Sequence, residues 1–433
     1  MRDPDGRLEF SEREVIRYIS PNAPSLAFLH DGISERLSTE GRLVPFEFTD
    51  QYTVRHPRYK FVSYPFEWCD AQLAAAAAHT ILIAKDVLQS GFEIKDASAW
   101  NVIFDGCMPA FCDHLSFEKI SKKQWWAFGQ FARHFILPLA ISRRRGLNAY
   151  ELFMIYRDGV PIDKARKFLG AARFIDRTVF LFAGRASKEG ADYRVKESIA
   201  VQSDAYHGRI LNLCEWMLGS NHYEGASDWH GYTGDRSHYT ENESQLKRET
   251  VHRWMEHIAP EWVMDLGCNT GEFTQIAVDT GASVIAADLD HDCVQGVYAK
   301  FNGSRKVHPV ILNLGDMLGG KGFAGCEFPG FMGRAESVAD VVMMLALVHH
   351  LTISEGMAVE KIAEFSHQLT KKYLIIELID CSDTMARFLA DQRNRDISHL
   401  TVDKQLKAFS AYYDFIETIN LSAHRKLVLM KRK

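Results

Sequence analysis

Several features that would narrow the class of this protein are missing from its sequence. The eight cysteines are scattered over 433 residues and no two form a C-x-x-C pair. This spacing argues against a zinc site or a disulfide framework and favours reduced, mostly buried thiols. The opening stretch, MRDPDGRLEFSEREV, is charged and has no apolar signal region. Together these absences predict a cytoplasmic protein.

The sequence also lacks a membrane-length apolar run and a strong charge of either sign. Its most apolar stretch, 71–84, is interrupted by His79, so we expect a buried helix there and no membrane span. A formal net charge of −5 argues against a dedicated nucleic-acid binder. Hydrophobic residues make up 46% of the chain and charged residues 25%, which is typical of a globular protein with a sizeable core. A length of 433 residues is enough for two or three domains. The oligomeric state cannot be derived from these features.

The first half of the chain contains a pattern of acids around a predicted hairpin, in residues 92–118. Two short β-like runs flank an Asp-Gly turn at 105–106, which is a hairpin signal. Asp96 and Asn101 have the D-x-x-x-x-N spacing of a kinase catalytic loop, and Asp113 stands where a metal-binding aspartate would follow. The segment therefore resembles the protein-kinase and aminoglycoside-phosphotransferase-like fold. That resemblance implies Mg-ATP as cofactor, with Asn101 and Asp113 as metal ligands.

The kinase-like pattern is incomplete. Ile94 replaces the usual histidine, and neither a glycine-rich phosphate loop nor a clear strand lysine stands upstream. Two interpretations of residues 1–220 therefore stay open. They form an α+β module that transfers phosphoryl groups, or a kinase-like remnant kept as a scaffold or acceptor-binding domain.

Residues 221–250 are predicted to be a linker, because Gly, Ser, Asn, Asp and His dominate their first part. Four large aromatic residues stand in it: Tyr223, Trp229, Tyr232 and Tyr239. They either pack over a neighbouring site or anchor the linker to a domain surface.

The stretch 262–290 has the form of a strand at 262–266, a glycine turn, a helix, a strand at 284–287 and an acid, Asp288. Gly267 and Gly271 are four residues apart, unlike the G-x-G-x-x-G that seats a dinucleotide pyrophosphate. With Asp265 before the first glycine, the stretch resembles motif I of class I S-adenosylmethionine (SAM)-dependent methyltransferases; the alternative is a generic strand-turn-helix. The cofactor-binding residues implied are Asp265, Gly267, Asn269 and Gly271 at the amino-acid end of SAM and Asp288 at its ribose.

The pattern of residues 251–433 predicts an α/β domain. Continuous apolar strands alternate with helices, which indicates a parallel sheet covered on both faces. We expect five parallel strands followed by a C-terminal antiparallel hairpin, the Rossmann-like sheet of class I methyltransferases. Seven glycines in 314–338 predict a long ordered loop between the third and fourth strands.

Ligands bind at the carboxyl ends of parallel strands, and polar residues stand at several of these ends. His349 and His350 follow the fourth strand, and either is a candidate base that removes a proton from the methyl acceptor. Glu377, late in the fifth strand, is a second candidate. Asn313 is the candidate on the adenine side of the cofactor. The alternatives are structural: a histidine at the edge of the core, and a glutamate that holds a lysine or a helix N-terminus.

Five stretches occur in the order KDASAWNVIF, DHLSFE, WWAFGQFARHFILPLA, DLGCNTGEF and LALVHHL. Together they resemble a bacterial family of two-part SAM-dependent methyltransferase-like proteins that includes the rhizobial nodulation protein NoeA. The resemblance implies a methyltransferase domain joined to an N-terminal module. By analogy, the acceptor would be a small molecule or a glycan from carbohydrate or surface-glycan metabolism.

Three functions of different classes follow from these patterns. The first is a SAM-dependent methyltransferase with an unidentified acceptor. The second is a phosphotransferase or bifunctional enzyme that uses Asp96, Asn101 and Asp113. The third is a non-enzymatic SAM-binding sensor or scaffold.

Overall fold

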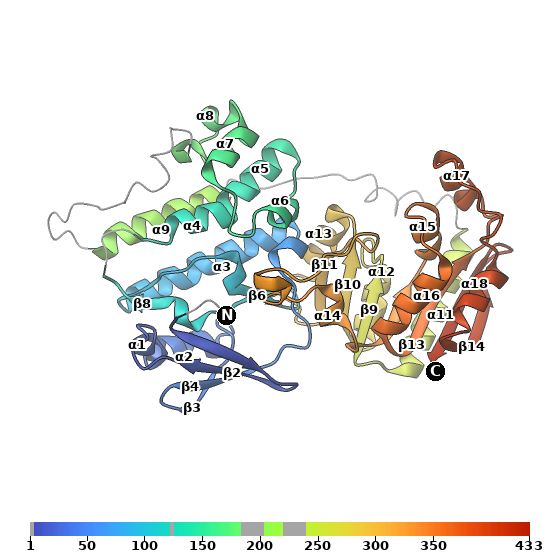
Figure 1. Cartoon of the computed structure of the whole chain (residues 1–433), viewed down its shortest axis with the longest axis horizontal. Coiled ribbons are helices and arrows are strands. Elements are labelled where there is room, and N and C mark those ends of the chain that lie inside the picture. The colour runs from blue at the N-terminus through green and yellow to red at the C-terminus, as the bar shows by residue number, and fades with distance from the viewer. Residues whose placement is uncertain (1–3, 122–124, 183–202, 220–239) are drawn as a thin grey trace. The chain divides into compact units, whose positions relative to one another are not determined.

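The computed structural model describes residues 4–121, 125–182, 203–219 and 240–433 (Figure 1). The chain divides into two compact units: unit 1 comprises 1–59 and 63–225, and unit 2 comprises 60–62 and 226–433. The aromatic residues Tyr223, Trp229, Tyr232 and Tyr239 of the expected linker lie outside the described residues.

Unit 1 begins with an antiparallel sheet in the order β1-β2-β4-β3. Two helices separate the second and third strands in the chain (Figure 1). The elements are β1 (Gly6–Phe10), β2 (Glu14–Ile19), α1 (Leu26–Leu29), α2 (Gly32–Thr39), β3 (Glu47–Asp50) and β4 (Thr53–Pro57). The carboxylate of Asp31 accepts a hydrogen bond from the Ile33 amide and caps α2, because an N-terminal helical turn leaves its amides without partners.

The apolar stretch at 71–84 lies in α3 (Asp70–Gln89), and ten residues of this helix are buried. Among the described residues, α3 is the single helix that is long and apolar enough to cross a membrane by length and composition, and half of its most apolar window is buried. It contacts β5 (Phe92–Ile94), β7 (Met108–Phe111) and α9 (Ser203–Gly219). α3 is therefore packed as a core helix of unit 1.

The predicted hairpin is present in unit 1. Strands β6 (Val102–Asp105) and β7 pair antiparallel around a turn in which Gly106 has a φ of 65°. The other elements of the unit are η1 (Pro65–Glu67), η2 (Ala99–Asn101), η3 (His114–Ser116), β8 (Phe117–Lys119), α4 (Phe128–Phe131), the π-helix η4 (Ala132–Ile136), α5 (Leu137–Arg145), α6 (Ala149–Ile155), α7 (Ile162–Leu169), α8 (Ala172–Ile175) and η5 (Phe180–Phe182).

Unit 2 contains a seven-stranded sheet in the order β11-β10-β9-β12-β13-β15-β14. The strands are β9 (Trp262–Leu266), β10 (Ser283–Asp288), β11 (Val307–Ile311), β12 (Ala339–Met344), β13 (Thr370–Ile379), β14 (Tyr413–Asn420) and β15 (Arg425–Arg432). The first five pair in parallel, whereas β15 is antiparallel to β13 and to β14. The prediction of an α/β fold with a mixed sheet is confirmed.

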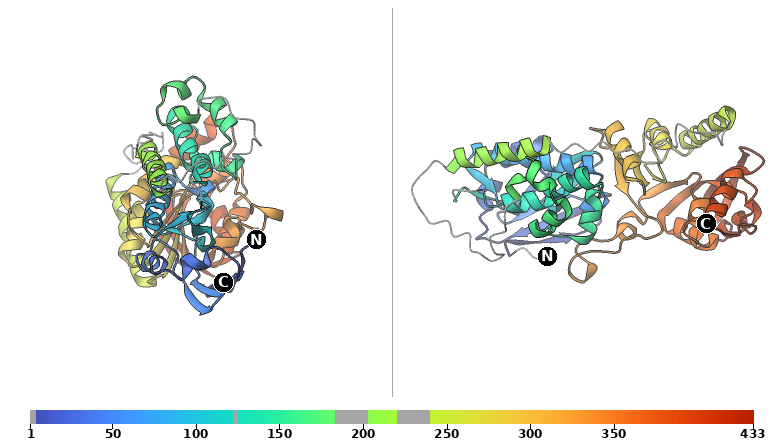
Figure 2. Two further views of the ribbon diagram at one scale, coloured as in Figure 1. Left: turned by 90° about the vertical axis from the view of Figure 1, so that its left-hand side faces the viewer. Right: turned by 90° about the horizontal axis from the view of Figure 1, so that it is seen from above.

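Helices cover both faces of this sheet (Figure 2). They are α11 (Glu241–Ile258), α12 (Glu272–Asp279), α13 (His291–Lys300), η6 (Phe323–Gly325), α14 (Phe331–Ala335), α15 (Val348–Ile353), α16 (Val359–Leu369), α17 (Thr384–Gln392) and α18 (Val402–Phe409). Side chains from alternate strand positions enter different cores: Met264 and Leu266 pack toward α14 and α16, whereas Val263 packs toward α11. Alternation along each strand thus builds the two hydrophobic layers.

The structure corrects two predicted boundaries and adds two short helices to a predicted loop. Residues 241–250, expected to be linker, form the first half of α11, because Thr240 and Glu243 make a capping box that starts a helix. Residues 60–62 belong to unit 2, where the Phe61 ring contacts His308 and Phe331. The glycine-rich stretch 314–338 is mainly loop, as expected, but it also contains η6 and α14.

Candidate cofactor-binding and catalytic site

The turn after β9 needs residues that tolerate the left-handed backbone region. Gly267 has a φ of 75°, Asn269 of 47° and Gly271 of 74°. A side chain at either glycine would meet a neighbour, since an added Cβ would lie 3.4 Å from Leu347 Cδ1 at position 267 and 3.1 Å from Val297 Cγ2 at position 271. The predicted glycine turn is therefore a backbone requirement of this sequence.

The amides of this turn are used inside the protein. The N–H groups of Gly267 and Cys268 donate to the Ala287 carbonyl at 2.8 and 3.1 Å, and that of Gly271 donates to the Cys268 carbonyl at 2.9 Å. The remaining two amides, those of Asn269 and Thr270, donate to the side chains of Asp288 and Asn269 at 2.8 and 2.7 Å. A phosphate-binding turn directs its amides at the ligand, so this turn is not built for a phosphate.

Asp265 lies at the end of β9, with its side chain buried. Its carboxylate accepts a hydrogen bond from the Thr274 hydroxyl at 2.7 Å. Burial, reinforced by the negative charge of Asp288, raises the pKa of Asp265 to about 6, although the Thr274 bond and the charge of Lys247 oppose the shift. A cation placed beside Asp265 would remove much of this electrostatic cost.

Asp288 ends β10, and its two carboxylate oxygens accept from the amides of Asn269 and Asp290. Burial raises the pKa of Asp288, and the remaining lone pairs can take ribose hydroxyls. Asn313 is exposed just beyond β11 and accepts from the Gly315 amide at 2.9 Å. The sheet places these two residues on neighbouring strand ends, since Asp288 pairs with Ile311.

The two candidate histidines follow the fourth strand, as expected, but lie on a helix. β12 ends at Met344, Ala346 has a φ of 54°, and His349 and His350 belong to α15. Successive residues of a strand point in opposite directions, but these two rings contact each other with centroids 4.2 Å apart. His349 is buried and His350 is partly exposed, so His350 is the more accessible of the pair.

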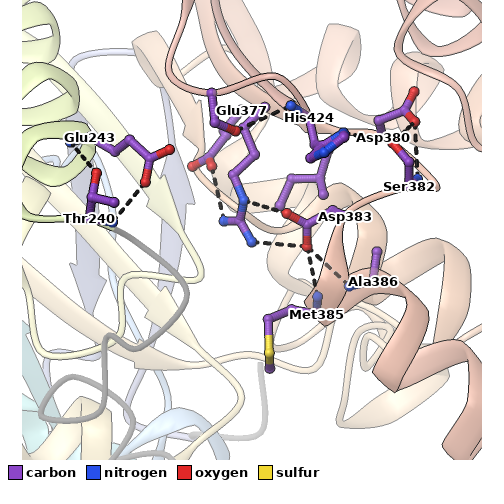
Figure 3. Close-up of polar contacts among 12 residues, drawn as sticks. Thr240, Glu243, Glu377, Asp380, Ser382, Asp383, Met385, Ala386 and His424 are labelled. Carbon is purple, nitrogen blue, oxygen red and sulfur yellow. Dashed lines mark hydrogen bonds and ion pairs between the residues drawn. The ribbon is translucent and has the colours of Figure 1, made fainter.

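Glu377 is fully buried and lies in a network of charges (Figure 3). One carboxylate oxygen lies 2.6 Å from Lys247 Nζ and the other 3.5 Å from Arg425 Nη1. Arg425 also holds the carboxylate of Asp383 through two hydrogen bonds of 2.8 and 3.1 Å. This placement favours a role in positioning Lys247 and Arg425 over the predicted role as a base.

Three residues of this region were not found from the sequence. Lys247 lies in the stretch predicted as linker, and Arg425 lies in the final hairpin, far from any motif. Thr274 carried a weak signal, because it follows Gly271 by one helical turn and can reach back to the preceding strand end. Their importance comes from packing, which brings α11 and β15 beside β13 and β9.

The structure brings Asp96, Asn101 and Asp113 together in unit 1. The side-chain amide of Asn101 donates a hydrogen bond to the backbone carbonyl of Asp96 at 2.9 Å. The charge of Asp113 acts on the Asp96 carboxyl and, after burial, is the next cause of the rise in its pKa. The Asp113 carboxylate accepts hydrogen bonds from Ser116, from the Leu115 amide and from Arg17.

Arg17 forms an ion pair with Asp113 that was not predicted from the sequence. It lies on β2, is 6% exposed, and its Nη1 is 3.2 Å from Asp113 Oδ1. The described residues contain no group of three or more His, Cys, Asp or Glu side chains that could hold a metal ion. The cation beside Asp113 in this structure is the guanidinium of Arg17. The kinase-like character of unit 1 stays a prediction.

Comparisons with known proteins give one relative in sequence and several likenesses in structure. No protein-family model matches the chain. The chain is similar to the nodulation protein NoeA of Rhizobium meliloti (strain 1021), with 26% identity over 416 residues that cover 91% of this chain and 87% of NoeA.

Among solved structures, magnesium protoporphyrin IX methyltransferase (ChlM) from Synechocystis PCC 6803 with bound SAM has a TM-score of 0.32 and 14% identity, covering 48% of this chain and 86% of that chain. The N-methyltransferase NodS from Bradyrhizobium japonicum WM9 has a TM-score of 0.33 and 9% identity, covering 44% of this chain and 97% of that chain. These TM-scores are too low to carry an argument about activity. In sequence, the chain is thus similar to NoeA along most of its length.

Proposed function

We propose that the chain is a SAM-dependent methyltransferase and that unit 2 is its class I methyltransferase domain. The observation that carries the proposal is the turn at 267–271, whose amides are occupied internally while Asp265 and Asp288 stand beside it. Such a site disfavours phosphates and favours a cation. SAM carries a sulfonium and an ammonium and has no phosphate, so it fits where a dinucleotide would not.

The position of this turn in the sheet supports the same conclusion. β9 lies between β10 and β12, so the chain continues to one side of β9 and later returns to the other. Ligands of open parallel sheets bind at the carboxyl ends of the strands at such a switch point. Asp265 then takes the ammonium of SAM, Gly267, Asn269 and Gly271 allow its methionine end to approach the backbone, and Asp288 takes the ribose hydroxyls. Asn313 stands on the adenine side.

SAM supplies an activated methyl group on sulfur, so the protein chiefly aligns the acceptor with that group. Positioning of this kind is worth roughly 7–11 kcal/mol of barrier. A hydroxyl or protonated amine acceptor also has to lose a proton. His350, which is partly exposed, is the proposed base, with the contacting His349 as its neighbour.

The acceptor we propose is a small molecule or a glycan. The similarity to the nodulation protein NoeA supports an acceptor from carbohydrate or surface-glycan metabolism. This step is an analogy between relatives and is independent of the cofactor site.

A thermal-shift panel on the full chain tests the class of cofactor. SAM and S-adenosylhomocysteine should each raise the melting temperature of unit 2, because a ligand that binds the native state stabilises it. NAD and ATP should not stabilise unit 2. Stabilisation by NAD without any effect of S-adenosylhomocysteine would overturn the proposal.

The second candidate function is phosphotransfer by unit 1. The observation that favours it is the hydrogen bond from Asn101 to the Asp96 carbonyl, which sets the two residues beside Asp113. Arg17 opposes it, because it already occupies one carboxylate oxygen of Asp113. The expected signature is stabilisation of unit 1 by Mg-ATP that disappears in Asp113→Ala. An equal shift in wild type and variant removes this candidate.

A non-enzymatic role as a SAM-binding sensor or scaffold makes the same binding predictions. Turnover separates the two roles: an enzyme converts methyl-labelled SAM to S-adenosylhomocysteine when its acceptor is supplied, whereas a sensor leaves SAM intact. His350→Ala is the matched variant, since it should keep cofactor binding and lose turnover.

A further inference from the structure

The outer helical part of unit 1 presents an apolar surface that neither proposed site uses. Phe174, Ile175, Phe180 and Leu181, on α8 and η5, are 55%, 80%, 59% and 58% exposed. We refer to these four residues as the α8–η5 patch. At roughly 150–250 Å² for a large side chain, they expose on the order of 500 Å². The largest apolar patch on a soluble monomer is about this size and is often a functional surface.

The patch is held in place by polar contacts behind it. The Asp176 carboxylate is 3% exposed and lies 2.7 Å from Arg144 Nε and beside Arg143. Its other oxygen accepts from the Thr178 amide at 3.0 Å. α8 contains no buried residue and contacts α7 and η5, at the outer edge of the unit (Figure 1). The exposed side chains therefore stand on a turn anchored to α5.

The segment that carries the patch has a net charge opposite to that of the whole protein. Residues 143–182 contain nine Lys or Arg and four Asp or Glu, a net charge of +5, whereas the full chain has −5. Two of the four acids, Asp158 and Asp176, are already paired with arginines. Two cations of this segment are exposed: Lys167 on α7, a helix that contacts α8, and Arg177 between α8 and η5. Exposed apolar side chains in a segment with exposed cations match the interface of an anionic bilayer, where acyl chains lie beneath headgroup phosphates.

We propose that the α8–η5 patch docks unit 1 on a membrane surface that contains anionic lipids. The four apolar side chains enter the boundary between headgroups and acyl chains, and Lys167 and Arg177 face the phosphates. This docking is peripheral and needs no membrane-spanning segment. It is independent of the methyltransferase proposal, because no residue of unit 2 takes part.

Co-sedimentation of the full chain with large unilamellar vesicles tests this inference. Binding is expected to vesicles of phosphatidylcholine with 30% phosphatidylglycerol, to weaken as salt is raised, and to be at least tenfold lower on phosphatidylcholine alone. The double variant Phe174→Ser/Ile175→Ser should lose at least tenfold in partitioning. Lys167→Gln/Arg177→Gln should lose severalfold and should also show less dependence on salt.

The matched control is Phe388→Ser, which removes a side chain of similar exposure, 54%, from α17 of unit 2. It should bind vesicles like wild type. Equal binding to neutral and anionic vesicles overturns the proposal, and so does unchanged binding in the double serine variant. A serine variant that shifts the mass from dimer to monomer in light scattering, with no effect on vesicles, also overturns it and assigns the patch to self-association.

Discussion

Asp265 is the proposed partner of the SAM ammonium, and burial of its carboxylate has a free-energy cost that can be measured in the protein without ligand. Its carboxyl is buried and its pKa is raised to about 6, chiefly by burial. The ionised form is therefore less favourable in the folded chain than in the unfolded chain, and this cost is present above about pH 6 and absent at low pH. The ammonium of a bound ligand would relieve it and lower the pKa again.

Binding of S-adenosylhomocysteine should depend on pH through Asp265. Because ligand is expected to bind the carboxylate form of Asp265, affinity for S-adenosylhomocysteine should be constant above pH 7 and weaken as pH falls through about 6. Isothermal titration from pH 5 to 8 measures this. Asp265→Asn, which cannot titrate, should bind more weakly and show a flatter profile. A wild-type affinity that is flat over the whole range contradicts this role.

Gly271 provides a second test at the residue scale. Gly271→Ala places a side chain at a φ of 74° and 3.1 Å from Val297, whereas Gly281→Ala meets a similar backbone problem, a φ of 101°, in open space. Both variants should lose about 1–2 kcal/mol of unfolding free energy from backbone strain, measured in urea. Gly271→Ala alone should weaken S-adenosylhomocysteine binding. Equal binding by the two variants would remove Gly271 from the site.

At the scale of elements, a chain of charges links α11 to β13 and β15. Asp265, Glu377 and Arg425 occupy the same face of the sheet, because their positions alternate with the core residues Leu266, Ile376 and Val428. Lys247 of α11 covers that face and pairs with Glu377. The helix that precedes the sheet is thereby attached to the strand ends that build the site.

Substitution of Lys247 should destabilise the protein, because the buried carboxylate of Glu377 would lose its nearest positive charge. Lys247→Met leaves the buried Glu377 carboxylate with weaker compensation from Arg425, and we expect a loss of about 3 kcal/mol in unfolding free energy. Glu377→Gln added to Lys247→Met should recover at least half. Lys361→Met, which breaks an exposed pair with Glu364, should change little in the same urea titrations. Additive effects of Lys247→Met and Glu377→Gln would show that the pair is not coupled.

The strands of unit 2 could be predicted closely because fully buried parallel strands are continuous apolar runs. β9 has the predicted bounds, Trp262–Leu266, and β10 extends the predicted 284–287 by one residue at each end. The helix α15 was missed, because the apolar letters that end β12 continue without a turn signal into His349. The backbone changes direction between β12 and α15 at Ala346, which has a φ of 54°. Alanine rarely adopts this conformation, so the sequence gives no signal of it.

Some residues of the candidate site could likewise be predicted from the sequence, and others could not. Asp265, Gly267 and Gly271 follow from local rules of spacing and backbone freedom, and the structure places them at the end of β9 and on the turn after it. Lys247 and Arg17 could not be found, since each meets its acid only through packing of elements distant in the chain. Long-range ion pairs leave no periodic signal in a single sequence.

At the scale of the molecule, the chain enters unit 2 twice. Residues 60–62 belong to unit 2 although their neighbours on both sides belong to unit 1. Phe61 is 2% exposed and packs between His308 of β11 and Phe331 of α14, while Arg334 donates to the Val62 carbonyl. Part of the stability of unit 2 is therefore supplied by the first half of the sequence.

Phe61→Ala should consequently destabilise unit 2. Loss of a buried phenylalanine costs about 3–5 kcal/mol, so amide hydrogens of β11 and α14 should exchange correspondingly faster in mass-spectrometric hydrogen exchange. Phe10→Ala, at a side chain that is 62% exposed, should leave the exchange of those segments unchanged. Unaltered exchange of β11 in Phe61→Ala would show that residues 60–62 do not stabilise unit 2.

We propose that SAM binds at the turn 267–271 beside Asp265. Isothermal titration of the full chain with S-adenosylhomocysteine at pH 7.5 tests this proposal, with Asp414→Ala as the control because Asp414 is exposed on β14. We predict micromolar binding by wild type and control and at least a hundredfold loss in Asp265→Ala, with the folded spectrum kept. Wild-type affinity in Asp265→Ala, or no binding by wild type, would show that SAM does not bind at this turn.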